Sequence, residues 1–161
     1  MNSSNIITVG IAEAKIIFGE DILVTYALGS CVGVCLYEVE NKIAGMVHIL
    51  LPKQQNAVIG SNEYKFADSG IRKLVEKMEK KGANRRRLVA KIAGGAEMFK
   101  TEETKTGIGN RNVIAVKETL QALYIPIIAE HTGNNYGRSI WFSCKDGSLK
   151  IKTVNKGILK I

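Results

Sequence analysis

Short apolar runs separated by polar turns occupy the first third of the chain. Ile6 to Ala14 and Ile22 to Tyr26 are rich in β-branched residues, and a polar turn around Gly19 separates them. Val32 to Tyr37 is apolar enough for a buried strand, and a similar run, Ile43 to Leu51, follows after a short polar turn. The pattern therefore predicts two strands followed by a β-hairpin.

Apolar residues at helical spacing predict two helices in the rest of the chain. The first has Ser61 or Asn62 as its N-cap, runs to Lys81 and carries the apolar stripe Phe66, Ile71, Leu74, Val75 and Met78. The second has Asn110 as its N-cap, ends before Pro126 and carries the apolar stripe Val113, Val116, Leu120 and Leu123.

Further strands are expected around the second helix. Leu88 to Ala93 is predicted to be a strand that ends at a bend made by Gly94 and Gly95. Three antiparallel strands are predicted at Ile127 to Thr132, Ser139 to Cys144 and Leu149 to Val154.

Composition favours one globular domain over residues 1–161, with 45% hydrophobic and 24% charged residues. No apolar run approaches the roughly 20 residues that cross a bilayer, so we expect no membrane insertion. The N-terminus shows no secretory signal, and the 3 cysteines lack framework spacing. These features indicate a cytoplasmic protein with free thiols.

The formal net charge of +8 favours acidic partners. Most of the excess is scattered, with clusters at Lys80-Lys81, at Arg85 to Arg87 and in the lysine-rich C-terminal segment. Because no aromatic residues are interleaved with these clusters, a solvated basic face is favoured over nucleic-acid binding.

Cys31 and His48 are the candidate chemical groups. If the hairpin turn is centred near residue 40, Cys31 and His48 lie opposite each other, with Cβ atoms about 5 Å apart. A thiolate is a nucleophile, and an imidazole can take the proton of the thiol, so the two side chains would form a catalytic dyad. The alternatives are a small buried cysteine and a core histidine that is hydrogen-bonded by a neighbour.

Three neighbouring residues support the dyad. Gly29 and Ser30 permit a sharp bend before Cys31 and leave backbone N–H groups free to stabilise an oxyanion. Thr25 is a hydroxyl candidate for orienting the imidazole, although Thr is also a common strand residue.

Other chemistry is disfavoured by the spacing of the candidate ligands. Cys31, Cys35 and Cys144 do not have the spacing of a zinc knuckle, so we expect no metal site. His131 is expected to pack or to face solvent rather than to act as a base.

Several blocks of the chain resemble the CheD family of chemoreceptor glutamine deamidases. These blocks cover nearly the whole chain in order: Ala27 to Tyr37, Gly45 to Pro52, Tyr64 to Asp68, Lys91 to Phe99, Ile108 to Val113 and Gly137 to Ile140. One departure is Gly133-Asn134, where the family tends to have two glycines.

The resemblance implies a cysteine hydrolase without a cofactor that converts selected glutamines of chemotaxis receptors to glutamate. The family's thiol, imidazole and hydroxyl would fall on Cys31, His48 and Thr25. The implied fold is α+β, with mixed β-sheets layered against two or three helices, similar to the catalytic domain of deamidating bacterial toxins. The implied partners are the cytoplasmic helices of the receptors and a CheC-type phosphatase, for which Phe99 is a candidate contact or a buried aromatic. The alternative is a non-catalytic module that binds and stimulates that phosphatase.

Overall fold

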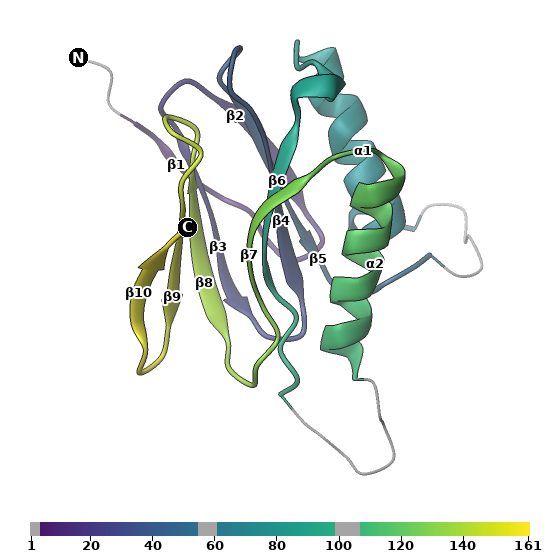
Figure 1. The fold of residues 1–161 in the computed structure, drawn as a ribbon, viewed down its shortest axis with the longest axis vertical. Coiled ribbons are helices and arrows are strands. Elements are labelled where there is room, and N and C mark those ends of the chain that lie inside the picture. The colour runs from purple at the N-terminus through teal and green to yellow at the C-terminus, as the bar shows by residue number, and fades with distance from the viewer. Residues whose placement is uncertain (1–3, 55–60, 99–106) are drawn as a thin grey trace.

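The computed structural model describes residues 4–54, 61–98 and 107–161 (Figure 1). Sheet A has five strands in the order β1 (Ile6–Thr8), β3 (Ile22–Leu28), β8 (Arg138–Ser143), β9 (Leu149–Thr153) and β10 (Gly157–Lys160). Sheet B has five strands in the order β2 (Ala14–Phe18), β5 (Ile43–Ile49), β4 (Val32–Glu38), β6 (Val89–Gly94) and β7 (Ile127–Thr132). The helices are α1 (Ala67–Lys80), α2 (Ile108–Ala122) and the 3₁₀ turns η1 (Glu63–Lys65) and η2 (Arg85–Arg87).

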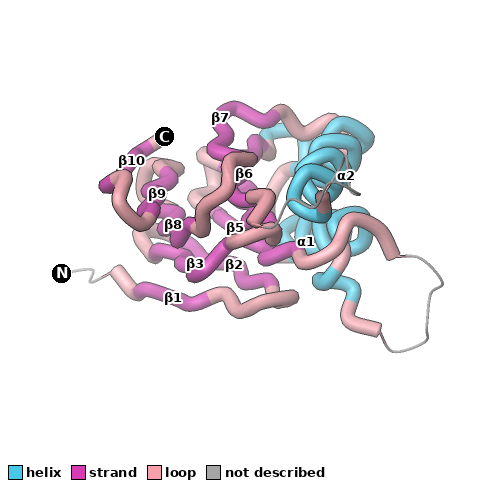
Figure 2. Tube along the Cα trace, turned by 90° about the horizontal axis from the view of Figure 1, so that it is seen from below, coloured by secondary structure: helices cyan, strands magenta, loops and turns pink. Residues whose placement is uncertain are grey.

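The elements form three layers, with sheet B between sheet A and the two α-helices (Figures 1 and 2). Each sheet contains one parallel pair, β1 with β3 and β6 with β7, among antiparallel neighbours. The predicted α+β class with mixed sheets is therefore confirmed, whereas the likeness to toxin domains stays a prediction.

Sheet B separates two buried layers. The helix layer contains Val34, Val47, Leu74 and Leu120 among its members and lies between sheet B and the α-helices. The inter-sheet layer contains Cys31, Cys35, Met46, Ile140 and Phe142 among its members and lies between the two sheets. Every residue of β4 and β5 is buried, because both faces of these strands are covered. This double coverage explains the continuous apolar runs, and the predicted hairpin is confirmed.

The helix stripes are largely confirmed, but both predicted starts need correction. Asn62 caps η1 rather than α1, and Phe66 precedes α1 in an extended conformation. α2 begins at Ile108, with Gly107 in place of Asn110 as its N-cap. The backbone N–H of Asn110 donates instead to the carboxylate of Glu97 at 2.8 Å. A side chain from a distant loop therefore performs the capping that a local residue was expected to perform.

The prediction of one strand over residues 6–14 is wrong. Ala12 has a φ of 57°, and the chain turns there between β1 and β2. The two strands then enter different sheets, because β1 pairs with β3 and β2 pairs with β5. A run of β-branched residues cannot reveal such a change of sheet, since either strand alone satisfies the pattern.

The antiparallel arrangement predicted for the last strands is also partly wrong. β7 pairs in parallel with β6 in sheet B, whereas β8 and β9 form an antiparallel pair in sheet A. β10, which the pattern did not predict, adds an edge strand beside β9.

Candidate active site

Thr25 and His48 join the two sheets by a hydrogen bond. Thr25 lies on β3 of sheet A, His48 lies on β5 of sheet B, and Thr25 Oγ1 is 2.7 Å from His48 Nδ1. The hydroxyl of Thr25 donates its single proton to the carbonyl oxygen of Val9 at 2.7 Å. Its oxygen must therefore accept a hydrogen bond from His48, which places the imidazole proton on Nδ1. This tautomer leaves Nε2 unprotonated.

A β-bulge follows Thr25 directly. The register between β3 and β8 shifts between Thr25 and Leu28, and Ala27 adopts a φ of 56°. Bulges turn the side chains of a strand relative to its neighbours. Here the shift ends the regular pairing of β3 just before the turn that leads to Cys31.

The imidazole of His48 is buried, with 1% of its surface exposed. Burial lowers its pKa to about 4, because a charged ring would be deprived of water. Nε2 accepts no hydrogen bond from any described residue. The ring is therefore neutral at neutral pH and carries an unused buried acceptor.

Cys31 lies just before β4, with 8% of its surface exposed, and it belongs to the inter-sheet layer. Burial raises the pKa of its thiol, so the resting side chain is a neutral thiol. Among the described residues it forms no hydrogen bond with His48. Thiol and imidazole thus share one buried layer as two neutral groups.

The predicted pairing of Cys31 with His48 is wrong by two residues. The residue opposite His48 is Gly33, and Val32 pairs with Ile49. The turn falls later than predicted because β4 continues to Glu38, whose carboxylate accepts hydrogen bonds from the backbone N–H groups of Glu40 and Asn41. A shift of two keeps both side chains on the predicted face, since side chains alternate along a strand. Cys31 is therefore a diagonal neighbour of His48.

Gly33 keeps the space beside the imidazole free of a side chain. A Cβ atom there would lie 2.7 Å from Ile140 Cδ1 and 3.3 Å from Leu28 Cδ1. Real Cβ contacts are not this short, so sheet A packs closely against the backbone of β4 at this point. The close approach brings Thr25 of sheet A within reach of His48.

The turn at Gly29 to Cys31 is fixed by the chain segment that follows β6. Gly95 N–H donates to Cys31 O at 2.8 Å, and Ala96 N–H donates to Gly29 O at 2.9 Å. Gly94 has a φ of 114°, and a Cβ atom there would overlap the carbonyl oxygen of Cys31. The carbonyl groups of the turn are thus occupied, and its N–H groups donate to no other described residue.

Asn112 on α2 holds the same turn from the side of the helices. It is fully buried, and its Nδ2 donates to Ser30 O at 2.9 Å and to Leu50 O at 3.0 Å. One side chain therefore links the residue before Cys31 to the chain just beyond the strand of His48. The sequence reasoning missed this residue. A polar residue directly before Val113, the first position of the predicted apolar stripe, was the available signal.

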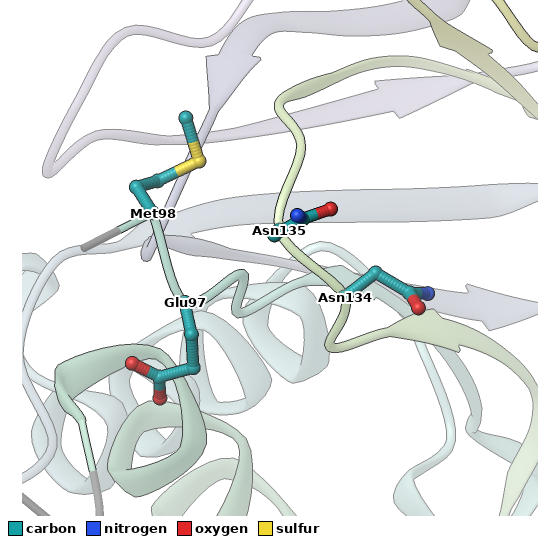
Figure 3. Close-up of a pocket in the computed structure, with 4 residues that line it drawn as sticks. All are labelled: Glu97, Met98, Asn134 and Asn135. Atoms are coloured by element: carbon teal, nitrogen blue, oxygen red, sulfur yellow. The ribbon is translucent and has the colours of Figure 1, made fainter. Parts of the chain in front are cut away.

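A hollow of about 440 Å³ adjoins the turn, lined by Glu97, Met98, Asn134 and Asn135 (Figure 3). Met98 is 45% exposed, and its Cγ would lie 3.5 Å from a Cβ atom built on Gly29. Figure 3 shows Met98 and Glu97 pointing in opposite directions, with Glu97 turned toward the start of α2. The outer side of the Gly29 turn therefore borders an open, partly polar hollow.

The remaining candidates lie apart from this cluster. His131 Nδ1 accepts a hydrogen bond from Arg138 Nε at 2.8 Å, so this imidazole is occupied by a neighbour. Cys35 and Cys144 are buried free thiols, and burial raises the pKa of Cys144 to about 11. Phe99 lies outside the described residues. Within residues 4–54, 61–98 and 107–161, no three His, Cys, Asp or Glu side chains are grouped to hold a metal ion.

Comparisons with known proteins agree on one family. A family model described as CheD chemotactic sensory transduction matches residues 50–153. A protein of Caldanaerobacter subterraneus named as a probable chemoreceptor glutamine deamidase CheD is 52% identical over 157 residues, which cover 96% of this chain and 97% of that protein. Relatives with the same name in Syntrophomonas wolfei and, as CheD 1, in Methanosarcina acetivorans are 47% and 44% identical. They cover 96% and 98% of this chain and 97% and 98% of their own lengths. Among the described residues no helix is long and apolar enough to cross a membrane.

Proposed function

The chain belongs to the CheD family, and we propose that it hydrolyses the side-chain amide of selected glutamines in chemotaxis receptors to glutamate. The names of the relatives support the substrate class. The observation that carries the chemistry is the Thr25–His48 hydrogen bond, because it leaves Nε2 as a buried acceptor in the layer that holds Cys31. A neutral imidazole with a free Nε2 is the form that takes a proton from a thiol.

In the first step, the Cys31 sulfur attacks the carbonyl carbon of the glutamine amide while His48 Nε2 takes the thiol proton. A C–S bond forms, and the carbonyl oxygen gains negative charge. Gly29 to Cys31 supply backbone N–H groups that donate to no other described residue and can bind this oxyanion. His48 then gives its proton to the amide nitrogen, and the C–N bond breaks. Ammonia leaves, and the glutamine carbonyl carbon remains bound to Cys31 as a thioester.

In the second step, water replaces the sulfur. His48 Nε2 takes a proton from the water as its oxygen attacks the thioester carbon. The C–S bond breaks, glutamate is released, and the proton on His48 returns to sulfur. Thr25 holds the ring in one tautomer throughout, and as a neutral hydroxyl it adds little to the basicity of the ring.

Neutral resting groups set this site apart from a thiolate–imidazolium pair. Burial lowers the pKa of His48 to about 4 and raises the pKa of the Cys31 thiol, so proton transfer accompanies attack instead of preceding it. Catalytic hydrogen bonds are often long in unbound enzymes and tighten in the complex. The diagonal placement of Cys31 and His48 is consistent with a bond that forms when the substrate is bound.

The test is mass spectrometry of a receptor cytoplasmic fragment after incubation with the parent protein or the Cys31→Ala variant. We expect the amide-to-acid mass change and released ammonia only with the parent protein. Equal conversion by Cys31→Ala would remove Cys31 from the mechanism, and no conversion by the folded parent protein would overturn the proposed function.

A second proposed role is binding of a CheC-type phosphatase beside the turn. Met98 supports it, because this half-exposed side chain lies against Gly29 and a partner seated there would cover the approach to Cys31. Inhibition of deamidation by the phosphatase, relieved by Met98→Ala, is the expected result. Inhibition that Met98→Ala leaves unchanged would place the partner elsewhere.

A further inference from the structure

The outer face of sheet A has no helix over it in the described part of the chain (Figures 1 and 2). Along β9, the side chains of Leu149, Ile151 and Thr153 are buried, whereas those of Lys150 and Lys152 are exposed. Alternate residues of a strand point to opposite faces, so both lysines point away from the inter-sheet layer.

The strand register gathers an aromatic and cationic surface on this outer face. Trp141 on β8 pairs with Lys150, and Lys160 on β10 pairs with the same lysine from the other side. The ring of Tyr26 meets Trp141 edge to face, with ring centroids 6.0 Å apart. We call Tyr26, Trp141, Lys150, Lys152 and Lys160 the basic sheet face.

The positive charge of this face is poorly compensated. Residues 145–161 contain five lysines and one acidic residue, Asp146, which lies 4.0 Å from Lys160. Lys150 and Lys152 take part in no ion pair with the described residues. The face therefore presents positive charge to whatever approaches it.

A groove of about 520 Å³ lies on this face. Its lining includes Tyr26, Trp141 and Lys152 of the basic sheet face, together with Ala27. Ala27 stands at the bulge of β3, directly before the Leu28 to Cys31 segment. A chain lying in the groove would contact Lys152 and Ala27, so part of it would lie close to the segment that carries the candidate nucleophile.

We propose that the basic sheet face docks an acidic segment of the protein substrate and so presents the nearby glutamine to Cys31. This inference rests on the proposed function. Charge complementarity selects a segment rich in aspartate and glutamate, and the groove places part of that segment beside Ala27. A nucleic acid fits this face less well. The rings of Tyr26 and Trp141 contact each other edge to face, so they do not present two free ring faces on which bases could stack.

The test compares the parent protein with Lys150→Glu/Lys152→Glu and with the milder Lys150→Gln/Lys152→Gln. The probe is the receptor cytoplasmic fragment, and kcat and KM for deamidation are measured over a range of salt concentrations. The matched control is Arg72→Glu/Arg86→Glu, which changes the net charge equally at two exposed residues on α1 and η2, outside sheet A. Thermal unfolding checks the fold, and the rate of Cys31 alkylation by iodoacetamide checks the site.

We expect Lys150→Glu/Lys152→Glu to lower kcat/KM by on the order of tenfold or more, mainly through KM, with a smaller loss for the Gln variant. The parent rate should fall as salt rises, and the rate of the Glu variant should depend less on salt. The control and the alkylation rate should match the parent.

An active parent protein whose Lys150/Lys152 variants behave like the Arg72/Arg86 control would overturn this docking face and leave the proposed function intact. An inactive parent protein would instead overturn the proposed function itself. Salt-sensitive binding of an oligonucleotide to the same lysines, with an unchanged KM for the receptor fragment, would also overturn the inference.

Discussion

The two buried layers on either side of sheet B differ in chemistry. The apolar residues buried in the helix layer are all Val, Leu, Ile, Ala or Met. The inter-sheet layer contains all three cysteines, and Thr25 and His48 meet within it. One sheet thus packs for stability on its helical side and carries reactive groups on the other.

The difference follows from which side chains the packing of each layer brings together. In the helix layer, aliphatic side chains of α1 and α2 fill the surface of sheet B, and burial of apolar area stabilises the fold. In the inter-sheet layer, the side chains of Leu28 and Ile140 pack directly against the β4 backbone at Gly33, so a hydroxyl of one sheet can reach an imidazole of the other. Changes in the helix layer should therefore alter stability, and changes in the inter-sheet layer should alter activity.

The largest expected effect comes from the thiol itself. Cys31→Ala should lower deamidation by a factor of at least about 10³, because no other group can form the thioester. The matched control is Cys35→Ala, which removes another thiol of the inter-sheet layer that is fully buried. Turnover of the receptor fragment measures both variants, and an equal loss in the control would indicate damage to the layer instead of loss of a nucleophile.

A substitution in the helix layer should lower stability and leave activity unchanged. Leu74 is fully buried in α1, so Leu74→Ala should lower the free energy of unfolding by roughly 2–5 kcal/mol. Denaturant unfolding measures this loss, and kcat of the folded variant should equal that of the parent. A lower kcat at full folding would show that the two layers are coupled.

Thr25 tests the hydrogen bond between the sheets. Thr25→Val keeps the shape but removes the acceptor for His48 Nδ1–H, and we expect activity to fall by on the order of 100-fold. Thr25→Ser retains a hydroxyl and should recover most of the rate. If the Val and Ser variants are equally active, Thr25 does not orient the imidazole.

Two glycines allow the same methyl group to be added on each side of sheet B. A Cβ atom on Gly33 would lie 2.7 Å from Ile140 in the inter-sheet layer, and one on Gly45 would lie 2.8 Å from Met78 in the helix layer. Each change to Ala should cost about 1–3 kcal/mol of stability through overpacking. Only Gly33→Ala should also lower kcat, since the added methyl group pushes the sheets apart beside His48. Kinetics on both folded variants measure this difference, and an equal loss of kcat in Gly45→Ala would contradict it.

The smallest expected effect is the pH dependence of stability that His48 contributes. Its pKa is lowered to about 4 in the folded protein from 6.5, so acid favours the unfolded chain, which binds the proton more tightly. This contribution is complete above about pH 6.5 and is lost progressively as the pH falls toward 4. Between pH 7 and 5.5 the loss should be about 1 kcal/mol.

Denaturant unfolding of the parent and of His48→Gln at several pH values isolates the contribution of His48 to the pH dependence of stability. The stability difference between the two proteins should shrink as the pH falls from 7 to 5.5, because only the parent takes up a proton on unfolding at this position. A constant difference would mean that the imidazole is not held neutral by burial.

Local pattern was sufficient for much of the fold. The strand of His48, the stripe of α1 and the strand at β6 follow from apolar runs and from the helical spacing of apolar residues, since each element needs only its own sequence. The face shared by Cys31 and His48 was also predictable, because a register error of two residues preserves the side of the sheet. The resemblance of several sequence blocks added the family, which the comparisons show.

The sequence by itself determined most of the strands, both α-helices and which thiol and imidazole share a face. The tertiary structure alone decided that β1 and β2 enter different sheets, that β7 runs parallel to β6, and that Asn112 links the Cys31 turn to the end of the His48 strand. These pairings join residues far apart along the chain. They depend on which surfaces pack together, and local propensity carries no information about a partner that is distant in the sequence.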